Sequence, residues 1–309
     1  MKWVLSIVFV CLYTKALYAQ HDSQIGSYAF NQVMFNPAYA GGAKRSEATI
    51  LQRSQFIGFA GAPSVWNIAI KTPFEIEGLE QGAAFTLSSD RIGAFNKLHF
   101  AMGYAYWHKL QDAKIGAGVS LGAVSYTMTP TWEGIVDEAI PTQKESASAA
   151  FDVNVGLCYQ RQNWSVGLSC THVNQPQTLK LLSEDYGLTV QRTFYLNGEY
   201  RWQTPIEDLW FNPTAMVMMV SLLRPQLGIG GYAVYREQYW GGLSYRIGDA
   251  VGIMAGLFIK SLKFGLVYEY SLSKFAGYNG GNTEIFASYM FDINWSRKKK
   301  HYKSLRFLK

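Results

Sequence analysis

Apolar and polar residues alternate along much of the chain. In residues 98–106, 151–160 and 262–270, every second position is predominantly apolar, and the positions between are mostly small or polar. A period of two places successive side chains on opposite faces of an extended strand. These runs exceed the roughly five or six residues usual in soluble proteins and match the ~9–11 residues of a strand that crosses a bilayer at a tilt. The pattern predicts an all-β fold, a transmembrane outer-membrane β-barrel.

About fourteen antiparallel strands can be placed along the chain, an even number, as bacterial single-chain barrels have. They are residues 46–53, 65–71, 82–88, 97–108, 113–126, 149–160, 163–173, 192–202, 213–220, 226–235, 239–245, 251–259, 262–272 and 283–293. Alternation is weakest in 213–220. The strand at 113–126 loses phase near Ser125, which a β-bulge would explain.

The N-terminus has the features of a secretory signal peptide. Lys2 precedes an apolar run that is too short to span a membrane, and residues 16–19 (ALYA) offer a cleavage site before Gln20. The sequence thus predicts four parts: a signal peptide at 1–19, an N-terminal segment at 20–45 that could plug the lumen, a β-barrel at 46–295 and a basic periplasmic tail at 296–309.

Loop lengths predict which end of the barrel faces outward. If both chain ends are periplasmic, the external connections include 54–64, 89–96, 127–148, 174–191 and 273–282. The periplasmic ones include short turns at 109–112, 161–162, 236–238 and 260–261, with 72–81 and 203–212 longer. Short periplasmic turns and long external loops are typical of these barrels.

Five tryptophans fall at predicted periplasmic strand ends: Trp107, Trp164, Trp202, Trp240 and Trp295. An amphipathic indole ring suits the level of the lipid headgroups, so the five predict an aromatic girdle on the outer wall. A carbohydrate-stacking site is the alternative interpretation.

The net charge of +6 comes from the two ends of the chain. Residues 297–309 carry seven basic residues and no acid, and Lys2 and Lys15 lie in the leader; subtracting these nine leaves −3. The tail is either a solvated charge block or a contact for an acidic periplasmic partner, with Lys298, Lys299 and Lys300 as candidate residues. We expect no nucleic-acid partner for an exported barrel.

Signals of catalysis are weak. The five histidines are scattered without ligand spacing, which argues against a metal site, and neither a nucleophile elbow nor a P-loop is present. The sequence therefore predicts no catalytic residues, no cofactor and no metal. Isolated acids such as Asp152, Glu199 and Glu269 are expected to face a polar lumen.

Small residues and cysteines carry structural expectations. Gly116, Gly118 and Gly122 alternate within one strand, where close backbone packing explains them better than nucleotide binding does. Cys158 and Cys170 fall on opposite faces of a hairpin with a turn at 161–162, so both are expected to be free.

Five segments carry a resemblance to a known family. In order they are residues 36–41 (NPAYAG), 55–63 (QFIGFAGAP), 89–93 (SDRIG), 244–250 (SYRIGDA) and 268–274 (YEYSLSK). This ordered set is similar to the PorP/SprF family of type IX secretion system outer-membrane proteins, over roughly residues 24–293. The tail after Asp292 extends past the usual end of that family, and no family role is transferred to it.

The resemblance implies a structural or docking barrel in the cell outer membrane, surrounded by outer-membrane lipid. It implies secreted surface proteins or adhesins as external partners and periplasmic ring or motor components on the other side. The candidate external docking residues are Gln55, Phe56, Gly58, Phe59, Pro63, Asp90, Arg91, Arg246, Asp249 and Lys274. These loops either dock a partner or only brace the barrel mouth. A passive porin or solute channel is the alternative function.

Overall fold

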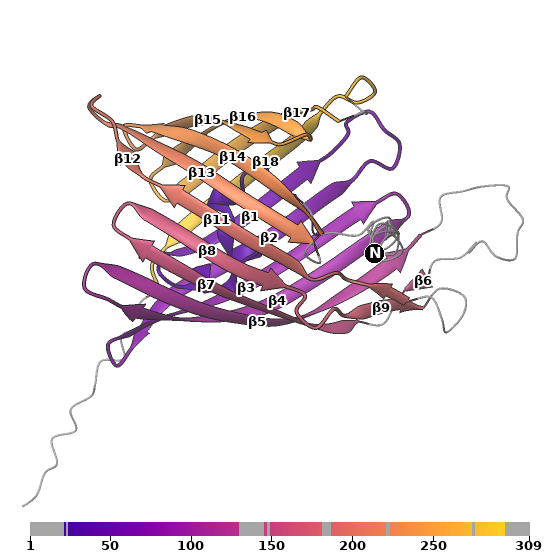
Figure 1. The fold of residues 1–309 in the computed structure, drawn as a ribbon, viewed down its shortest axis with the longest axis horizontal. Helices are drawn as coiled ribbons and strands as arrows, with labels where there is room; N and C mark the ends of the chain where they lie inside the picture. Colours follow the sequence, from indigo (N-terminus) through magenta and orange to yellow (C-terminus); the bar gives the residue numbers. More distant parts are fainter. Residues whose placement is uncertain are drawn as a thin grey trace, which may run out of the picture.

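The computed structural model describes residues 22, 24–129, 145–146, 149–180, 187–220, 223–273 and 276–293. The predicted leader, Trp295 and the basic tail lie outside these residues. Three short 3₁₀ turns precede a long series of antiparallel strands (Figure 1). Among the described residues, no helix has the length and apolar character needed to cross a membrane.

Fourteen strands form a closed wall. They are β1 (Ser46–Ser54), β2 (Ser64–Ile76), β3 (Leu79–Ile92), β4 (Phe95–Lys109), β5 (Ala113–Met128), β7 (Ala150–Arg161), β8 (Trp164–Thr171), β11 (Thr193–Tyr200), β13 (Leu209–Val220), β14 (Leu223–Tyr235), β15 (Tyr239–Arg246), β16 (Ala250–Ile259), β17 (Leu262–Ser271) and β18 (Asn282–Phe291). Each pairs with its neighbours, and β1 pairs with β18 to close the ring. The predicted fourteen-strand barrel is confirmed, strand for strand.

Four further short strands lie beside the wall or at its ends. They are β6 (Glu145–Ser146), β9 (Gln177–Lys180), β10 (Gly187–Thr189) and β12 (Trp202–Gln203). β6 continues the pairing of β5, β12 continues that of β13, and β9 and β10 form a separate hairpin.

The alternation places apolar side chains outside and mixed side chains inside. On β17, Leu266, Tyr268 and Tyr270 are exposed, whereas Val267 and Glu269 are buried. The same alternation recurs around the wall, with exposed leucine, isoleucine and aromatic side chains on the outer face. An apolar exterior over a polar interior is the arrangement that a lipid-embedded barrel requires.

Two predicted loops are wrong because the strands continue through them. β2 and β3 are joined by a two-residue turn at Glu77 and Gly78, not by a loop at 72–81, and both turn residues have positive φ (54° and 81°), as tight hairpin turns require. β3 and β4 likewise meet at 93–94, not across 89–96. These strand ends extend beyond the lipid-facing apolar part of the wall. Apolar and polar residues no longer alternate clearly there, so the sequence pattern did not reveal that the strands continue.

Register departs from expectation in two places. β5 pairs with β4 without any shift, so the bulge expected near Ser125 is wrong; the phase is lost because Val124 and Tyr126 face inward and are buried with Val190. The irregularity lies instead in β13, between Met218 and Val220.

The hairpin of β7 and β8 turns at 162–163, one residue later than predicted, so Cys158 pairs with Gly167 and Cys170 with Val155. A shift of the pairing by two residues leaves every side chain on its expected face. Cys158 is buried, Cys170 is half-buried, and both are free.

Below, the loop end of the barrel is the end holding the connections at 55–63, 93–94, 172–192, 247–249 and 272–281. The turn end holds those at 77–78, 110–112, 162–163, 236–238 and 260–261. The N-terminal segment, described at residue 22 and at residues 24–45, contains η1 (Tyr28–Phe30), η2 (Gln32–Met34) and η3 (Pro37–Ala40). It lies within the ring of strands (Figure 1).

Candidate functional site

The N-terminal segment runs through the lumen from one end to the other. Asp22 contacts Thr171 and His172, where β8 reaches the loop end. Arg45 contacts Ser261 and Asp292 at the turn end. The expectation that both chain ends lie at the same end of the barrel is therefore wrong for the described residues, because Asp22 lies at the loop end and Asp292 at the turn end.

Glycines in the wall make room for the segment. Added Cβ atoms at Gly82 and Gly118 would lie 2.3 Å from Gly41 N and 2.4 Å from Ala38 N, both backbone atoms. Ala38 has no exposed surface. The close packing expected at Gly118 is thus packing against the N-terminal segment, and a larger side chain there could not coexist with it.

Asn36 fastens the middle of the segment. Its Oδ1 accepts a hydrogen bond from Ala38 N–H over 2.9 Å and caps η3, while its Nδ2 donates to Leu157 O on β7 over 3.0 Å. Pro37 follows at the first position of the turn, where its missing N–H costs nothing. The NPAYAG motif therefore encodes a turn that is seated against the inner wall.

Two of the predicted girdle tryptophans point inward. Trp107 is 2 % exposed and donates Nε1–H to Ala38 O over 3.0 Å, and Trp240 is 4 % exposed. Trp164 and Trp202 are exposed on the outside. The girdle prediction is wrong for Trp107 and Trp240 because strand ends alone do not determine facing. Trp107 lies three residues after the lipid-facing Tyr104, so the alternation along β4 places it on the opposite, inward face. Following that alternation to the end of the strand would have predicted the inward position.

An aromatic cluster holds the first 3₁₀ turn toward the turn end. The ring of Phe30 lies 4.5 Å from that of Trp240, 4.9 Å from Tyr232 and 5.2 Å from Phe286, measured between centroids. Aromatic pairs at such distances stabilise beyond their buried area. Phe30 therefore anchors the segment to β14, β15 and β18.

Buried charges hold the chain just before this cluster. The backbone N–H groups of Gly26 and Ser27 each donate to the carboxylate of Glu284 over 2.9 Å. Arg53 lies between Glu284 and Glu269, and all three side chains are almost fully buried. Glu269, expected only to line a polar lumen, thus belongs to a specific ion-pair network.

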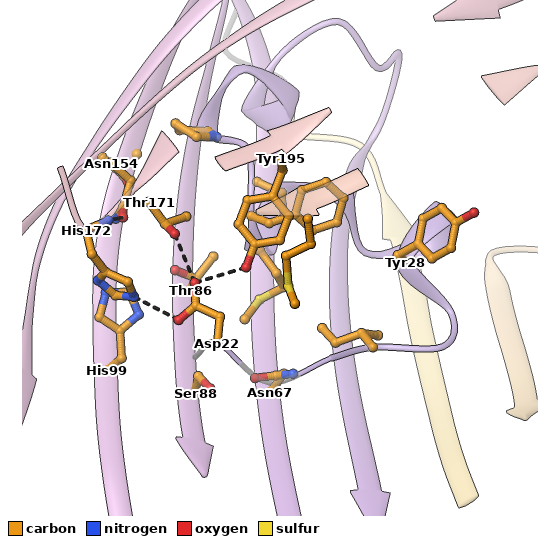
Figure 2. A pocket seen from close by; sticks show the side chains of 18 of the residues that line it. Asp22, Tyr28, Asn67, Thr86, Ser88, His99, Asn154, Thr171, His172 and Tyr195 are labelled. Atoms are coloured by element: carbon orange, nitrogen blue, oxygen red, sulfur yellow. Dashed lines mark hydrogen bonds and ion pairs between the residues drawn. The ribbon is translucent and has the colours of Figure 1, made fainter. Parts of the chain in front are cut away.

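A second polar cluster binds the start of the segment at the loop end (Figure 2). Asp22 Oδ1 lies 3.0 Å from Lys97 Nζ and 2.8 Å from His172 Nε2, and its Oδ2 accepts hydrogen bonds from Thr171 over 2.9 Å and Tyr195 over 3.0 Å. Four side chains thus converge on the Asp22 carboxylate: Lys97 from β4, Thr171 from β8, His172 from the residue after β8, and Tyr195 from β11.

The same cluster extends to a second carboxylate. His172 Nδ1 lies 2.8 Å from Asp152 Oδ1, and His99 Nε2 lies 2.9 Å from Asp152 Oδ2. Asn154 donates Nδ2–H to Asp152 over 3.2 Å and accepts the His172 backbone N–H over 2.8 Å. The structure thus brings together two histidines that the sequence presents as scattered.

Burial and neighbouring charges set the ionisation of Asp22 and His172 in this cluster. Burial disfavours the ionised form of Asp22, but His172 and Lys97 outweigh it and hold the pKa of the Asp22 carboxyl well below its usual range. Burial also lowers the pKa of His172, yet Asp22 opposes this and the net effect raises the pKa of His172 to about 8. The carboxylates and cations therefore hold one another in charged form.

Hydrogen bonds join the connections at the loop end into a rim. In the loop at 55–63, Ile57 donates its N–H to Gly281 O over 3.0 Å, and on the other side Gly93 N–H donates to Gly61 O over 2.9 Å. The loop is therefore fastened to the β3–β4 turn and to the β17–β18 connection.

The predicted docking residues occupy different positions on this rim. Gln55, Phe56, Gly58, Phe59 and Pro63 lie in the loop at 55–63, with Phe59 46 % exposed. Asp90 is buried, whereas Arg91, next to it on β3, is exposed. Lys274 and the tail residues Lys298, Lys299 and Lys300 lie outside the described residues.

Arg246 and Asp249 belong to the inner network. Arg246 pairs with Asp249, and its Nη2 lies 3.0 Å from Glu269 Oε2, with only 14 % of its side chain exposed. Of the predicted docking set, Phe59 and Arg91 thus offer outward side chains, while Arg246 braces the mouth.

The sequence pattern did not predict that the histidines and acids near the loop end of the lumen form a cluster. His99, Asp152 and His172 each occupy an inward position near the loop end of a strand, and that shared level is the signal that could have joined them. Asp22 lies before the barrel and gave no such signal, since its place depends on the path of the N-terminal segment.

The family model described as type IX secretion system membrane protein PorP/SprF matches residues 17–289. No curated protein matches the chain significantly by sequence.

Solved outer-membrane barrels resemble the structure at low identity. The CymD monoaromatic hydrocarbon channel is 11 % identical, with a TM-score of 0.49, and covers 88 % of this chain and 94 % of its own. A TodX monoaromatic hydrocarbon channel mutant is 10 % identical, with a TM-score of 0.49, covering 84 % and 94 %. The Acinetobacter baumannii outer membrane protein Omp33 is 9 % identical, with a TM-score of 0.44, covering 80 % and 98 %. Identities this low concern the fold alone.

Proposed function

This chain belongs to the PorP/SprF family of type IX secretion system membrane proteins, and from that premise we propose that it is a plugged docking barrel. It is an outer-membrane β-barrel of the secretion system. In the proposed role, its loop end holds secreted surface proteins during secretion or attachment, and its turn end links to periplasmic ring components. The role is one of binding and involves no catalysis.

The observation that carries this proposal is the filled lumen. The N-terminal segment passes from Asp22 at the loop end to Arg45 at the turn end, and it is fastened by buried charges, an aromatic cluster and glycine contacts. A solute channel needs a continuous water-filled path. A wall shaped around its own segment favours docking over passive transport.

The loop-end rim supports the same proposal. Its connections are joined by backbone hydrogen bonds, and a preorganised surface loses less conformational entropy when a partner binds. Phe59 and Arg91 are the exposed side chains of this rim that suit protein recognition, because aromatic residues and arginine are enriched at binding interfaces.

Partner capture tests the proposal. Tagged barrel should be purified from gently solubilised outer membrane as wild type, as the double variant Phe59→Ala/Arg91→Ala, and as Ile206→Ala, a control at the exposed turn end. We expect wild type and Ile206→Ala to retain the same secreted surface proteins and the double variant to lose most of them. Equal recovery in all three would contradict docking through the rim.

Conductance separates docking from transport. In planar bilayers the wild-type barrel should show no steady conductance, because the segment occupies the lumen. Steady, ohmic conductance from the wild-type protein would instead support a passive porin and contradict the plug.

A further inference from the structure

We propose that His99, Asp152 and His172 form a zinc site inside the loop end of the barrel, and that the bound metal helps to seat the N-terminal segment through Asp22. This goes beyond the docking role, because it assigns a ligand to a cluster within the lumen.

The donor atoms lie close together. His99 Nε2 and His172 Nδ1 flank the Asp152 carboxylate at 2.9 Å and 2.8 Å, and the three ligand atoms lie within 4.8 Å of one another. Tetrahedral zinc with bonds of about 2.0–2.1 Å holds its ligands about 3.3 Å apart. To admit the ion, the two rings move so that each nitrogen lies at about this distance from the other ligand atoms. Both metal-binding nitrogens must be free of protons, so the His172 Nδ1 proton leaves to solvent and the His99 Nε2 proton moves to its other ring nitrogen or to solvent as the metal binds.

The surroundings resemble those of a built metal site. Metal-binding histidines usually donate their other ring N–H to a carboxylate, which orients the ring. The Nε2 of His172 lies 2.8 Å from Asp22 Oδ1, and Asp22 is in turn held by Lys97. Asn154 donates to the other ligand, Asp152, over 3.2 Å. Both the ligand ring and the ligand carboxylate thus have outer partners.

The backbone also aims the ring inward. His172 has φ of +53° and directly follows β8, and its N–H is held by Asn154 Oδ1 over 2.8 Å. A non-glycine residue in this left-handed region costs free energy and often marks a functional position. This conformation turns the imidazole toward Asp152 and Asp22, as Figure 2 shows for its contact with Asp22.

Space and chemistry select the ligand. A cavity of about 80 Å³ adjoins the cluster and is lined by His99, His172 and Asn154 among others, which leaves room for a water molecule as the fourth ligand. Two imidazoles and one carboxylate suit zinc and related transition metals, whereas calcium and magnesium prefer oxygen ligands throughout.

Metal content is the direct test. Full-length barrel in detergent should be stripped with a chelator, dialysed, loaded with ZnCl₂ at pH 7.5 and passed over a desalting column. We expect wild type to retain one zinc per barrel. His99→Gln should retain none above background, while His108→Gln, an exposed histidine on the same strand, should behave as wild type. Heat-dependent gel mobility confirms that each variant is folded.

Two measurements keep the inference testable if His99→Gln does not fold. Cobalt(II) added to stripped wild type should give the visible absorption of a tetrahedral nitrogen–oxygen site. Asp22→Asn should bind zinc 10–100-fold more weakly, as expected for loss of an outer partner. Wild type that leaves the column without zinc, or equal zinc in His99→Gln and His108→Gln, would overturn the site and leave His172 as a proton bridge only.

Discussion

The two ends of the lumen hold the same segment by different means. At the loop end, Asp22 is bound by charged and hydroxyl groups, including Lys97 and His172. Toward the turn end, Phe30 packs among aromatic rings, and Trp107 covers Gly41 and Ala38. Polar anchoring depends on the ionisation of the groups involved, while the aromatic packing depends mainly on burial and shape.

This difference suggests which end can be released. Apolar burial is non-directional and changes little with solution conditions near neutral pH. A buried carboxylate, in contrast, costs free energy unless every partner is in place. We therefore expect the contacts of Asp22 at the loop end to be released more readily than the aromatic packing around Phe30.

The largest expected effect is at Trp107. Trp107→Ala removes a ring that is 2 % exposed and the hydrogen bond to Ala38 O, so it should lower the free energy of unfolding by about 3–5 kcal/mol. Trp202→Ala, at an exposed tryptophan, is the matched control and should change it little. Urea unfolding of the refolded barrel measures both. Equal effects would show that Trp107 belongs to an outer girdle after all.

Gly118→Ala comes next. The added methyl would lie 2.4 Å from Ala38 N, and overpacking of this kind costs about 1–3 kcal/mol. Gly103→Ala is the control, because its Cβ would meet only ordinary contacts at 3.5 Å and beyond. Proteolysis of the N-terminal segment should become faster in Gly118→Ala alone. Unchanged protection would mean that the segment is not held against β5.

Asp22→Asn should have a smaller and more local effect. The amide keeps the shape but loses the charge that faces Lys97 and His172, and hydrogen bonds to charged groups contribute about 1.5–3 kcal/mol, part of which the amide retains. We expect a loss of about 1–2 kcal/mol. Hydrogen exchange should rise at residues 24–26 and stay low at 38–41. A uniform rise along the segment would remove the proposed contrast between the two ends.

Deletion of residues 297–309 should leave the stability of the barrel unchanged. Its seven cations are proposed to contact an acidic periplasmic surface, and such contacts are screened over about 8 Å at physiological ionic strength. Full-length barrel should therefore co-purify with more periplasmic protein than the truncated form at low salt, and the gap should close at high salt. Identical recovery at every salt concentration would show that the tail has no such contact.

The wall of the barrel was largely predictable from the sequence, and its contents were not. Period-two alternation identified all fourteen strands, because each strand is a local pattern with one face toward lipid. Strand ends were less predictable. At 72–81, for example, the strands extend past the lipid-facing part of the wall, and neither face has to be apolar there. Trp107 and Trp240 were assigned to the wrong side because position along a strand says nothing about facing unless the phase is followed.

The cluster at the loop end depends on the closed ring. His99 lies on β4, Asp152 on β7 and His172 directly after β8. They meet because strand pairing sets them at one level and the curvature of the wall turns them inward. Asp22 joins them only because the N-terminal segment passes through the lumen. Alternation and motifs alone thus determined the fold, the family and the outer face. Tertiary structure decided the interior, since contacts across a lumen depend on registers and paths that no local pattern encodes.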